Sequence, residues 1–217
     1  MKILIKSALL LLLVTALIGC GSDVSSVDLV QREGIYYKKF SEVPFSGKLT
    51  GKEKGLIKNG KKEGEWITYN RKGELNSKGN YKNGKTEGAW VGYTDDGELS
   101  YKGGYKNGKK EGAWVGYSDD GQLSYKGNYK NGKEEGEWIA YTSGISLFFT
   151  NQLFSKGNYK NGKKEGVWVG YNENGQLVSK GNYKNGKKEG EWVDYNSEGT
   201  LNKEISGIYK DGEKISD

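Results

Sequence analysis

The stretch Glu87–Lys110 reads EGAWVGYTDDGELSYKGGYKNGKK, and Glu111–Glu134 repeats it almost unchanged as EGAWVGYSDDGQLSYKGNYKNGKE. A tryptophan near the start of each unit recurs at intervals of 24, 24, 24, 30 and 24 residues. These tryptophans are Trp66, Trp90, Trp114, Trp138, Trp168 and Trp192. Self-similarity at a short fixed period is typical of repeat architectures, in which each unit packs on its neighbours. Six units therefore extend over residues 63–214.

Two turn signals divide every unit. The first is Asn-Gly, as at Asn83-Gly84, and both residue types tolerate the positive φ of a type I′ hairpin turn. The second is a four-residue stretch that ends in glycine, such as Thr94–Gly97, which fits a type I turn closed by a left-handed glycine. Two turns per unit predict two strands per unit, each of roughly five to eight residues.

Alternation along the strands assigns their side chains to two faces. Val91 and Tyr93 are expected on the face opposite to Trp90. The tryptophan face of this unit is expected to carry Gly88, Trp90, Gly92, Leu99, Tyr101, Gly103 and Tyr105. Glycines beside the tryptophan lack the β-carbon, which leaves room for each indole ring to lie over the backbone.

The predicted fold class is all-β, an elongated single-layer antiparallel meander of tandem β-hairpin repeats that follows a helical signal peptide. With about 4.8 Å between strands, each unit advances the array by about 10 Å, so six units and a cap give a ribbon on the order of 60 Å long. Beyond the leader, the density of glycine and the absence of a 3.6-residue apolar period argue against helices.

The first residues have the pattern of a secretory leader. Met1–Lys6 carries two lysines and Ser7–Ile18 is almost wholly apolar, too short for a permanent membrane-spanning helix. The leader ends in Leu17–Cys20 (LIGC), which resembles the bacterial lipobox. The resemblance implies cleavage before Cys20, a diacylglycerol on its sulfur and an N-acyl lipid such as palmitate. Cys20 is the only cysteine, so no internal disulfide can form, and two or more acyl chains give lasting attachment.

These features divide the chain into five segments. We expect a signal peptide at 1–19, a tether at 20–33, an N-terminal cap or degenerate repeat at 34–62, the repeats at 63–214 and a tail at 215–217. The expected location is extracytoplasmic, anchored to a bacterial membrane. Because Gly21 and not Asp follows Cys20, the outer membrane is favoured if the organism has two membranes.

The composition excludes several classes of function. The chain has no histidine and one cysteine, which excludes zinc fingers, histidine-based triads and haem ligation by histidine. Its net charge of +6 comes almost entirely from lysine interspersed with acidic residues, as on a solvated surface, and we expect no nucleic-acid partner. Aspartates such as Asp95 and Asp96 occupy turn positions for conformational reasons. We therefore assign no catalytic residue, no metal site and no cofactor other than the lipid, although carboxylates alone leave a metal site open in principle.

The repeat unit, G-x-W-x-x-Y-x-x-x-G-x-L-x-x-x-G-x-Y-x-x-G, resembles the bacterial variant of the MORN repeat. Tyr36–Lys48 (YYKKFSEVPFSGK) is similar to the opening of the YwqK-like antitoxin family. The resemblance implies hairpin arrays used for binding or scaffolding, with no catalysis of their own.

Two groups of residues are candidates for binding. The fourth unit holds six extra residues, and this insertion (144–154) is the most apolar stretch after the leader. It either folds back as a cover over the aromatic face or forms a contact through Phe148, Phe149 and Phe154. The second group is the outward tyrosine row, which consists of Tyr69, Tyr93, Tyr117, Tyr141, Tyr171 and Tyr195. The tryptophans are expected in the core.

The lysines beside the turns allow two interpretations, and the last unit departs from the repeat pattern. Lysines repeat beside the Asn-Gly turns, where they either meet anionic lipid or cell-wall polymers or only keep the edge soluble, with nearby glutamates partly cancelling them. They include Lys85, Lys109, Lys133, Lys163 and Lys187. In the last unit, residues 203–207 are expected to lengthen the second strand before a terminal cap.

The expected function is that of a non-catalytic, membrane-anchored lipoprotein whose repeat ribbon binds or scaffolds a protein partner. Two alternatives remain: an antitoxin or immunity-like protein that neutralises a toxin, and a protein that binds cell-wall glycans.

Overall fold

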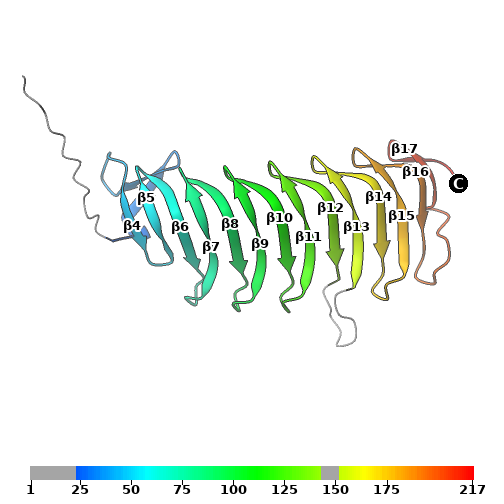
Figure 1. Cartoon of the computed structure of the whole chain (residues 1–217), viewed down its shortest axis with the longest axis horizontal. Coiled ribbons are helices and arrows are strands. Elements are labelled where there is room, and N and C mark those ends of the chain that lie inside the picture. The colour runs from blue at the N-terminus through cyan, green and yellow to red at the C-terminus, as the bar shows by residue number, and fades with distance from the viewer. Residues whose placement is uncertain (1–22, 143–151) are drawn as a thin grey trace, which may run out of the picture.

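The structure is a computed structural model that describes residues 23–142 and 152–217. The described chain forms a long ribbon of hairpins placed side by side (Figure 1). A 16-stranded sheet runs in the order β1, β4 and then β5 to β18 in sequence, and β2 and β3 form a separate two-stranded sheet. The expected all-β meander of hairpin repeats is confirmed. One short 3₁₀ segment, η1 (Ser26–Asp28), is the helical element of the described residues.

The strands of the repeats are long and regular. They are β6 (Lys61–Tyr69), β7 (Leu75–Lys82), β8 (Lys85–Tyr93), β9 (Leu99–Lys106), β10 (Lys109–Tyr117), β11 (Leu123–Lys130), β12 (Lys133–Tyr141), β13 (Leu153–Lys160), β14 (Lys163–Tyr171), β15 (Leu177–Lys184) and β16 (Lys187–Asp194). The first strands of the first five units have nine residues and the second strands eight. The first strands exceed the expected length because each begins directly after an Asn-Gly turn and continues through the tryptophan to the tyrosine.

The backbone angles confirm both kinds of turn. Asn107 has φ 52° and Gly108 φ 82°, the positive pair of a type I′ turn. At the opposite edge Gly97 has φ 83°, and its N–H donates to the Thr94 carbonyl over 3.1 Å. The Asn-Gly turns line the upper edge of the ribbon in Figure 1 and the four-residue turns line the lower edge.

A bulge near the start of each first strand corrects the simple alternation. Glu111 pairs with Gly104 and Trp114 with Gly103, so Gly112 and Ala113 have no partner on β9 and pair instead with β11. Gly112 has φ 71°, and a β-carbon there would meet nothing within 4 Å, so the backbone conformation rather than space requires glycine. Gly88, expected to share the face of Trp90 as in a regular strand, occupies the equivalent bulge with φ 70°.

Each indole ring lies on a bare stretch of the preceding strand. Gly103 pairs with both Trp90 and Trp114, and a β-carbon on Gly103 would overlap the Trp114 ring. The same overlap occurs at Gly55, Gly79, Gly127, Gly157 and Gly181. The expected packing of tryptophan over glycine is confirmed, and the glycines covered are those of the preceding strand.

Tryptophan and tyrosine alternate in one column along the ribbon, with ring centroids 5.1–6.3 Å apart in edge-to-face geometry. This aromatic column consists of Trp66, Tyr81, Trp90, Tyr105, Trp114, Tyr129, Trp138, Tyr159, Trp168, Tyr183 and Trp192. Each such pair contributes about 0.5–1.5 kcal/mol beyond the area it buries. The column is therefore a continuous core that every unit shares with its neighbours.

The indole N–H groups separate inner units from end units. Trp114 Nε1 donates to the Gly104 carbonyl over 3.0 Å, and Trp90, Trp138 and Trp168 make the equivalent bond. Trp66 and Trp192, at the two ends of the column, have a buried Nε1 with no partner among the described residues.

The N-terminal cap begins earlier than expected. β1 (Val24–Ser25) pairs in parallel with β4 (Gly47–Thr50), which leads to β5 (Glu53–Lys58), while β2 (Leu29–Arg32) and β3 (Ile35–Lys38) form the separate hairpin. Val24, Phe45, Leu49, Ile57 and Trp66 form the buried cluster of this cap. Residues 20–33 were expected to be a tether, but from Val24 onward they are folded, because Val24 finds an apolar partner in Leu49.

The C-terminal cap also differs from expectation. Residues 203–205 form a turn and do not lengthen a strand; β17 (Gly207–Lys210) and β18 (Glu213–Ser216) follow. The buried Ser206 Oγ accepts from the Asp194 N–H over 2.9 Å, which fixes the turn against β16. The expected tail, 215–217, is part of β18 as far as Ser216, which pairs with Ile208.

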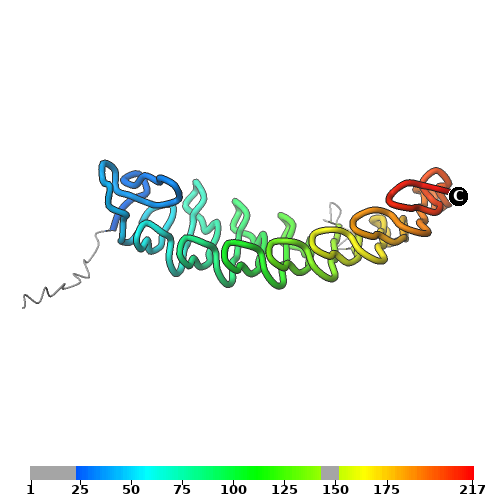
Figure 2. The backbone as a smooth tube through the Cα atoms, turned by 90° about the horizontal axis from the view of Figure 1, so that it is seen from above, coloured from blue at the N-terminus to red at the C-terminus, as the bar shows by residue number. Residues whose placement is uncertain are grey.

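The ribbon is gently curved along its length (Figure 2). Fifteen intervals between 16 strands, at about 4.8 Å each, correspond to roughly 70 Å, slightly longer than expected because the caps add strands. The expected leader with Cys20, and Phe148 and Phe149 of the insertion, lie outside the described residues. In the part of the chain that is described, no helix is long and apolar enough to span a membrane.

Replacing Gly103 by Ala should lower the free energy of unfolding by about 1–3 kcal/mol, because the added methyl group overlaps the Trp114 ring and forces it from its place. Urea denaturation of the full chain measures this. Lys106→Ala, on an exposed residue of the same strand, is the control and should change stability by less than about 0.5 kcal/mol. Equal stability of Gly103→Ala and wild type would contradict the packing.

Replacing Asn107 by Ala should cost about 1–2 kcal/mol, because alanine is strained at the positive φ of this turn. Asn107→Gly keeps the conformation accessible and should remain close to wild type. Thermal unfolding followed by tryptophan fluorescence distinguishes the two variants. The turn assignment fails if both lose the same stability.

Candidate binding surface

The tyrosine row predicted for binding lies next to the four-residue turns. Tyr93 ends β8 and pairs with Leu99 across the turn, and its five counterparts occupy the same place in the other units. All six are partly buried, so none of them presents a fully exposed ring. Lysine ammonium groups lie over two of them, Lys54 at 4.7 Å from the Tyr69 centroid and Lys102 at 6.0 Å from that of Tyr117.

Phe154 is the part of the apolar insertion that the structure describes. It lies in β13 at a bulge, where Ala140 pairs with Ser155 and Tyr141 with Leu153, and its side chain is 53% exposed. The structure thus brings Phe154 to the strand pair that holds Tyr141. With Phe148 and Phe149 outside the described residues, the choice between a cover and a contact stays open.

The face opposite to the aromatic column carries a second periodic pattern, which the sequence analysis did not single out. Lys102 pairs with Val91 on one side and Val115 on the other, so lysine and valine or isoleucine alternate across the strands. The equivalent lysines are all exposed, with one in the N-terminal cap and one in each of the first five units: Lys54, Lys78, Lys102, Lys126, Lys156 and Lys180. The signal was present as a lysine that precedes each covered glycine.

At the Asn-Gly edge, charged residues have structural roles. The Glu87 carboxylate accepts from the backbone N–H of Asn107 over 2.8 Å, and the same bond recurs from every unit to the next turn. The stem of Lys85 lies against Gly108 of that turn. These glutamates therefore join neighbouring units, which adds a role to the charge cancellation expected from the sequence.

Lysines also cover the aromatic column. Lys110 Nζ lies 4.1 Å from the Trp114 centroid and 4.8 Å from that of Tyr129, within the range of a cation–π interaction. Lys62, Lys164 and Lys188 have equivalent positions in their units. Burial against the rings lowers the pKa of Lys110, Lys164 and Lys188. We call this place, between a tryptophan and the following tyrosine, the ammonium seat.

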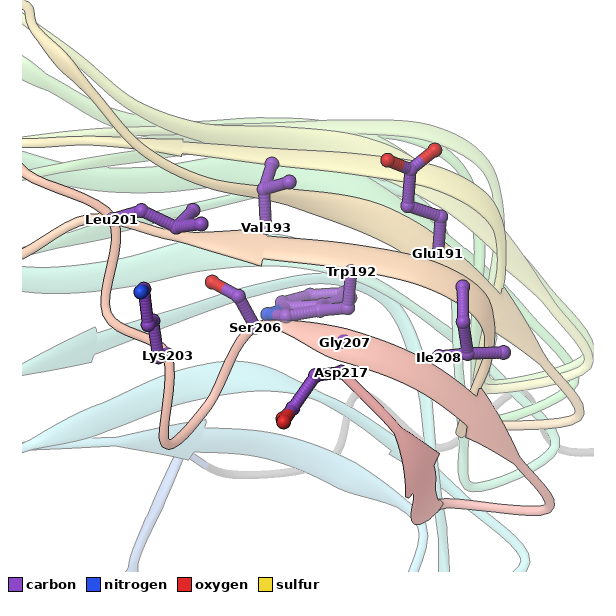
Figure 3. A pocket seen from close by; sticks show the side chains of 9 residues that line it. All are labelled: Glu191, Trp192, Val193, Leu201, Lys203, Ser206, Gly207, Ile208 and Asp217. Carbon is purple, nitrogen blue, oxygen red and sulfur yellow. The ribbon is translucent and has the colours of Figure 1, made fainter.

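A cavity of about 360 Å³ lies at the C-terminal end of the ribbon (Figure 3). Trp192 lies beside Ser206 and Gly207 in this view, while Glu191 and Val193 project to the other side of the strand. The rest of the lining is formed by Leu201, Lys203, Ile208 and Asp217. Within residues 23–142 and 152–217, no group of three or more potential metal-ligating side chains comes together.

The column affects the titration of its tyrosines. Burial, with a smaller contribution from the Glu134 carboxylate, raises the pKa of Tyr129 to about 12. Both causes disfavour the phenolate, so this hydroxyl group stays protonated in solutions where an ordinary tyrosine is ionised.

Stability should therefore fall as the pH rises through the interval from about 10 to about 12, since the unfolded chain loses the Tyr129 proton before the folded chain does. Titration followed by phenolate absorbance should show that Tyr129→Phe removes a step near pH 12 and leaves the amplitude near pH 10 unchanged. A step removed near pH 10 would contradict this assignment.

Comparison with known proteins gives one family. Residues 62–83, 110–131 and 164–185 match the model of the MORN repeat variant. No curated protein matches the chain. Each matched segment begins at a lysine of an ammonium seat, crosses one four-residue turn and ends at the asparagine of the next Asn-Gly turn. Three segments of the ribbon are therefore similar to the MORN repeat variant.

Proposed function

We propose that this protein is a membrane-anchored lipoprotein whose repeat ribbon binds or scaffolds other proteins without catalysis of its own. MORN repeats suggest a repeat-based role of this kind. The observation that carries the proposal is the single-layer sheet of 16 strands, whose units offer the same groups at regular steps.

The surface chemistry supports a protein partner. Each of the first five units presents a partly buried tyrosine at the end of its first strand and an exposed lysine beside valine or isoleucine on the face opposite to the column. Tyrosine is enriched among residues that dominate binding energy, and an apolar stripe bordered by charge resembles the core and rim of protein interfaces. An array of such sites gains avidity when a partner engages several units at once.

The anchor is proposed from the sequence. A basic and apolar leader precedes LIGC, and Cys20 is the residue that would carry the lipid. The folded cap begins at Val24, so attachment at Cys20 leaves the ribbon intact. We propose in addition that the membrane is bacterial, that the ribbon lies outside the cytoplasm and that the chain is related to the YwqK-like family.

The anchor is tested by producing the full chain in a bacterial host fed with an alkyne-labelled fatty acid. Wild type should be labelled and sediment with membranes. Cys20→Ser should lose the label because it lacks the thiol that accepts the lipid, while Ser22→Ala is the matched control and should keep it. Label on Cys20→Ser, or none on wild type, would contradict the anchor.

The binding role is tested in the same cells with a photo-crosslinking amino acid at Tyr93 or Tyr117, and at exposed Lys106 as the control. A partner held on the tyrosine row should give a discrete cross-linked protein from Tyr93 and Tyr117 and little from Lys106. Labelled cell-wall glycan in place of protein would support the glycan-binding alternative. No product from any position along the ribbon would refute the binding role.

A further inference from the structure

The residue four positions before each tryptophan fills the ammonium seat in some units and differs in others. These residues are Lys62, Thr86, Lys110, Glu134, Lys164 and Lys188. In the four lysine units the Nζ atom lies 4.0–4.2 Å from the tryptophan centroid and 4.7–5.2 Å from that of a tyrosine. The chain thus shows four times that a primary ammonium fits between these two rings.

The first unit shows that a carboxylate is compatible with the occupied seat. Lys62 Nζ lies 4.0 Å from the Trp66 centroid and also donates to Glu53 Oε2 over 2.8 Å. An ammonium held by an aromatic face and a carboxylate together is more strongly bound than by either group alone, because the ring quadrupole and the anion attract the same charge.

The fourth unit has the rings and a carboxylate but not the lysine. Trp138 has Tyr129 and Tyr159 edge-on at 5.2 and 5.8 Å and Tyr125 stacked on it at 5.8 Å. Glu134 stands where four of the other five units have lysine, and its charge, after burial, helps to raise the pKa of both Tyr129 and Tyr159. Among the described residues, no lysine lies over the Trp138 ring.

Exposure distinguishes this unit as well. The other five tryptophans are at most 7% exposed, whereas Trp138 is only partly buried. The second unit, with Thr86 in the seat, still buries Trp90 to 7% exposure and places no carboxylate there. Among the described residues, only the fourth unit combines a partly exposed indole, a flanking tyrosine and a negative charge.

We propose that the fourth unit binds a primary ammonium group, the lysyl side chain of a protein partner, in the seat formed by Trp138, Tyr159 and Glu134. The partner's lysine takes the place that Lys110 or Lys164 has in the neighbouring units. This deepens the binding function proposed above, on which it rests for its biological partner, by naming the chemistry of one contact.

The neighbouring charges allow this occupancy. Lys110 and Lys164 occupy the ammonium seats of the two neighbouring units, and adjacent units are about 10 Å apart along the ribbon. Lys164 and Lys188 already occupy adjacent seats, so two ammonium groups at this spacing are tolerated within the fold. Glu135, the next carboxylate, accepts from the Asn161 N–H over 2.9 Å and holds the turn. Glu134 is the carboxylate whose charge acts on Tyr159, and it acts on Lys110 as well.

The test uses the full chain in mild detergent with ¹⁵N-labelled tryptophan, which gives one indole signal per tryptophan. Nα-acetyl-lysine amide is added, and its uncharged analogue Nα-acetyl-norleucine amide serves as the control ligand. The Trp138 signal should shift in a saturable manner with the lysine compound alone. Added salt should weaken the binding, because the attraction is partly electrostatic.

Two variants test the seat. Glu134→Lys should fold, since four units carry lysine there, and should abolish the shift by filling the seat with an internal ammonium. Glu134→Gln keeps the shape and should weaken binding about two- to fivefold through loss of the charge. Thr86→Lys, the same change in the second unit, is the matched control and should leave the Trp138 response unchanged.

Absence of a Trp138 shift in wild type, or an undiminished shift in Glu134→Lys, would overturn the proposal. Cross-linking of the Glu134→Lys chain from the tyrosine row distinguishes failure of the proposed lysine site from failure of the proposed binding function. If a partner is captured from the tyrosine row but no Trp138 shift occurs, the seat is refuted and the binding role stands. If Trp138 responds and no partner is captured anywhere, the seat stands and the binding role fails.

Discussion

The packing of an indole ring on the bare backbone of a glycine is the interaction on which this ribbon depends. A single-layer sheet has no second layer against which to bury its apolar side chains, so it must bury them within its own surface. Trp114 lies flat on Gly103, tyrosine edges close both sides of the ring, and the Lys110 ammonium covers it. The result is a tryptophan that is 1% exposed in a sheet one layer thick.

The same arrangement explains why the units are nearly identical. Each glycine is covered by the tryptophan of the next strand, and each glutamate at the upper edge holds the turn of the next unit, so a unit is complete only when its neighbour is present. The two end tryptophans, whose indole N–H groups have no partner in the described part of the chain, are placed against caps of different sequence. A departure inside the array, such as Glu134, is therefore informative, because the surrounding repeats show what the position ordinarily does.

The hairpins, both turn types, the meander and the tryptophan core were predictable because they follow from local chemistry with a short period. The bulge at Gly112 was not, since glycine in a strand is equally compatible with regular pairing until the register is known. The cap was expected at 34–62, but its start at Val24 was missed because Val24 and Leu49 pair across 25 residues of chain without a repeated signal. The contact of Lys110 with Trp114 was missed for a similar reason. A lysine beside a turn is expected to be solvated unless the bulge that brings its side chain over the ring is known.

The early start of the cap at Val24 has a mechanical consequence. Only Gly21, Ser22 and Asp23 separate it from Cys20, and four residue steps reach at most about 14 Å. With the lipid proposed on Cys20, the N-terminal cap would stay close to the lipid headgroups. The ribbon, roughly 70 Å long, would pivot about this point of attachment. A change of pivot angle of a few degrees would then carry the far cap through several ångströms. The units near Trp192 would move over a larger range of positions above the bilayer, while those near Trp66 would stay close to the lipid surface.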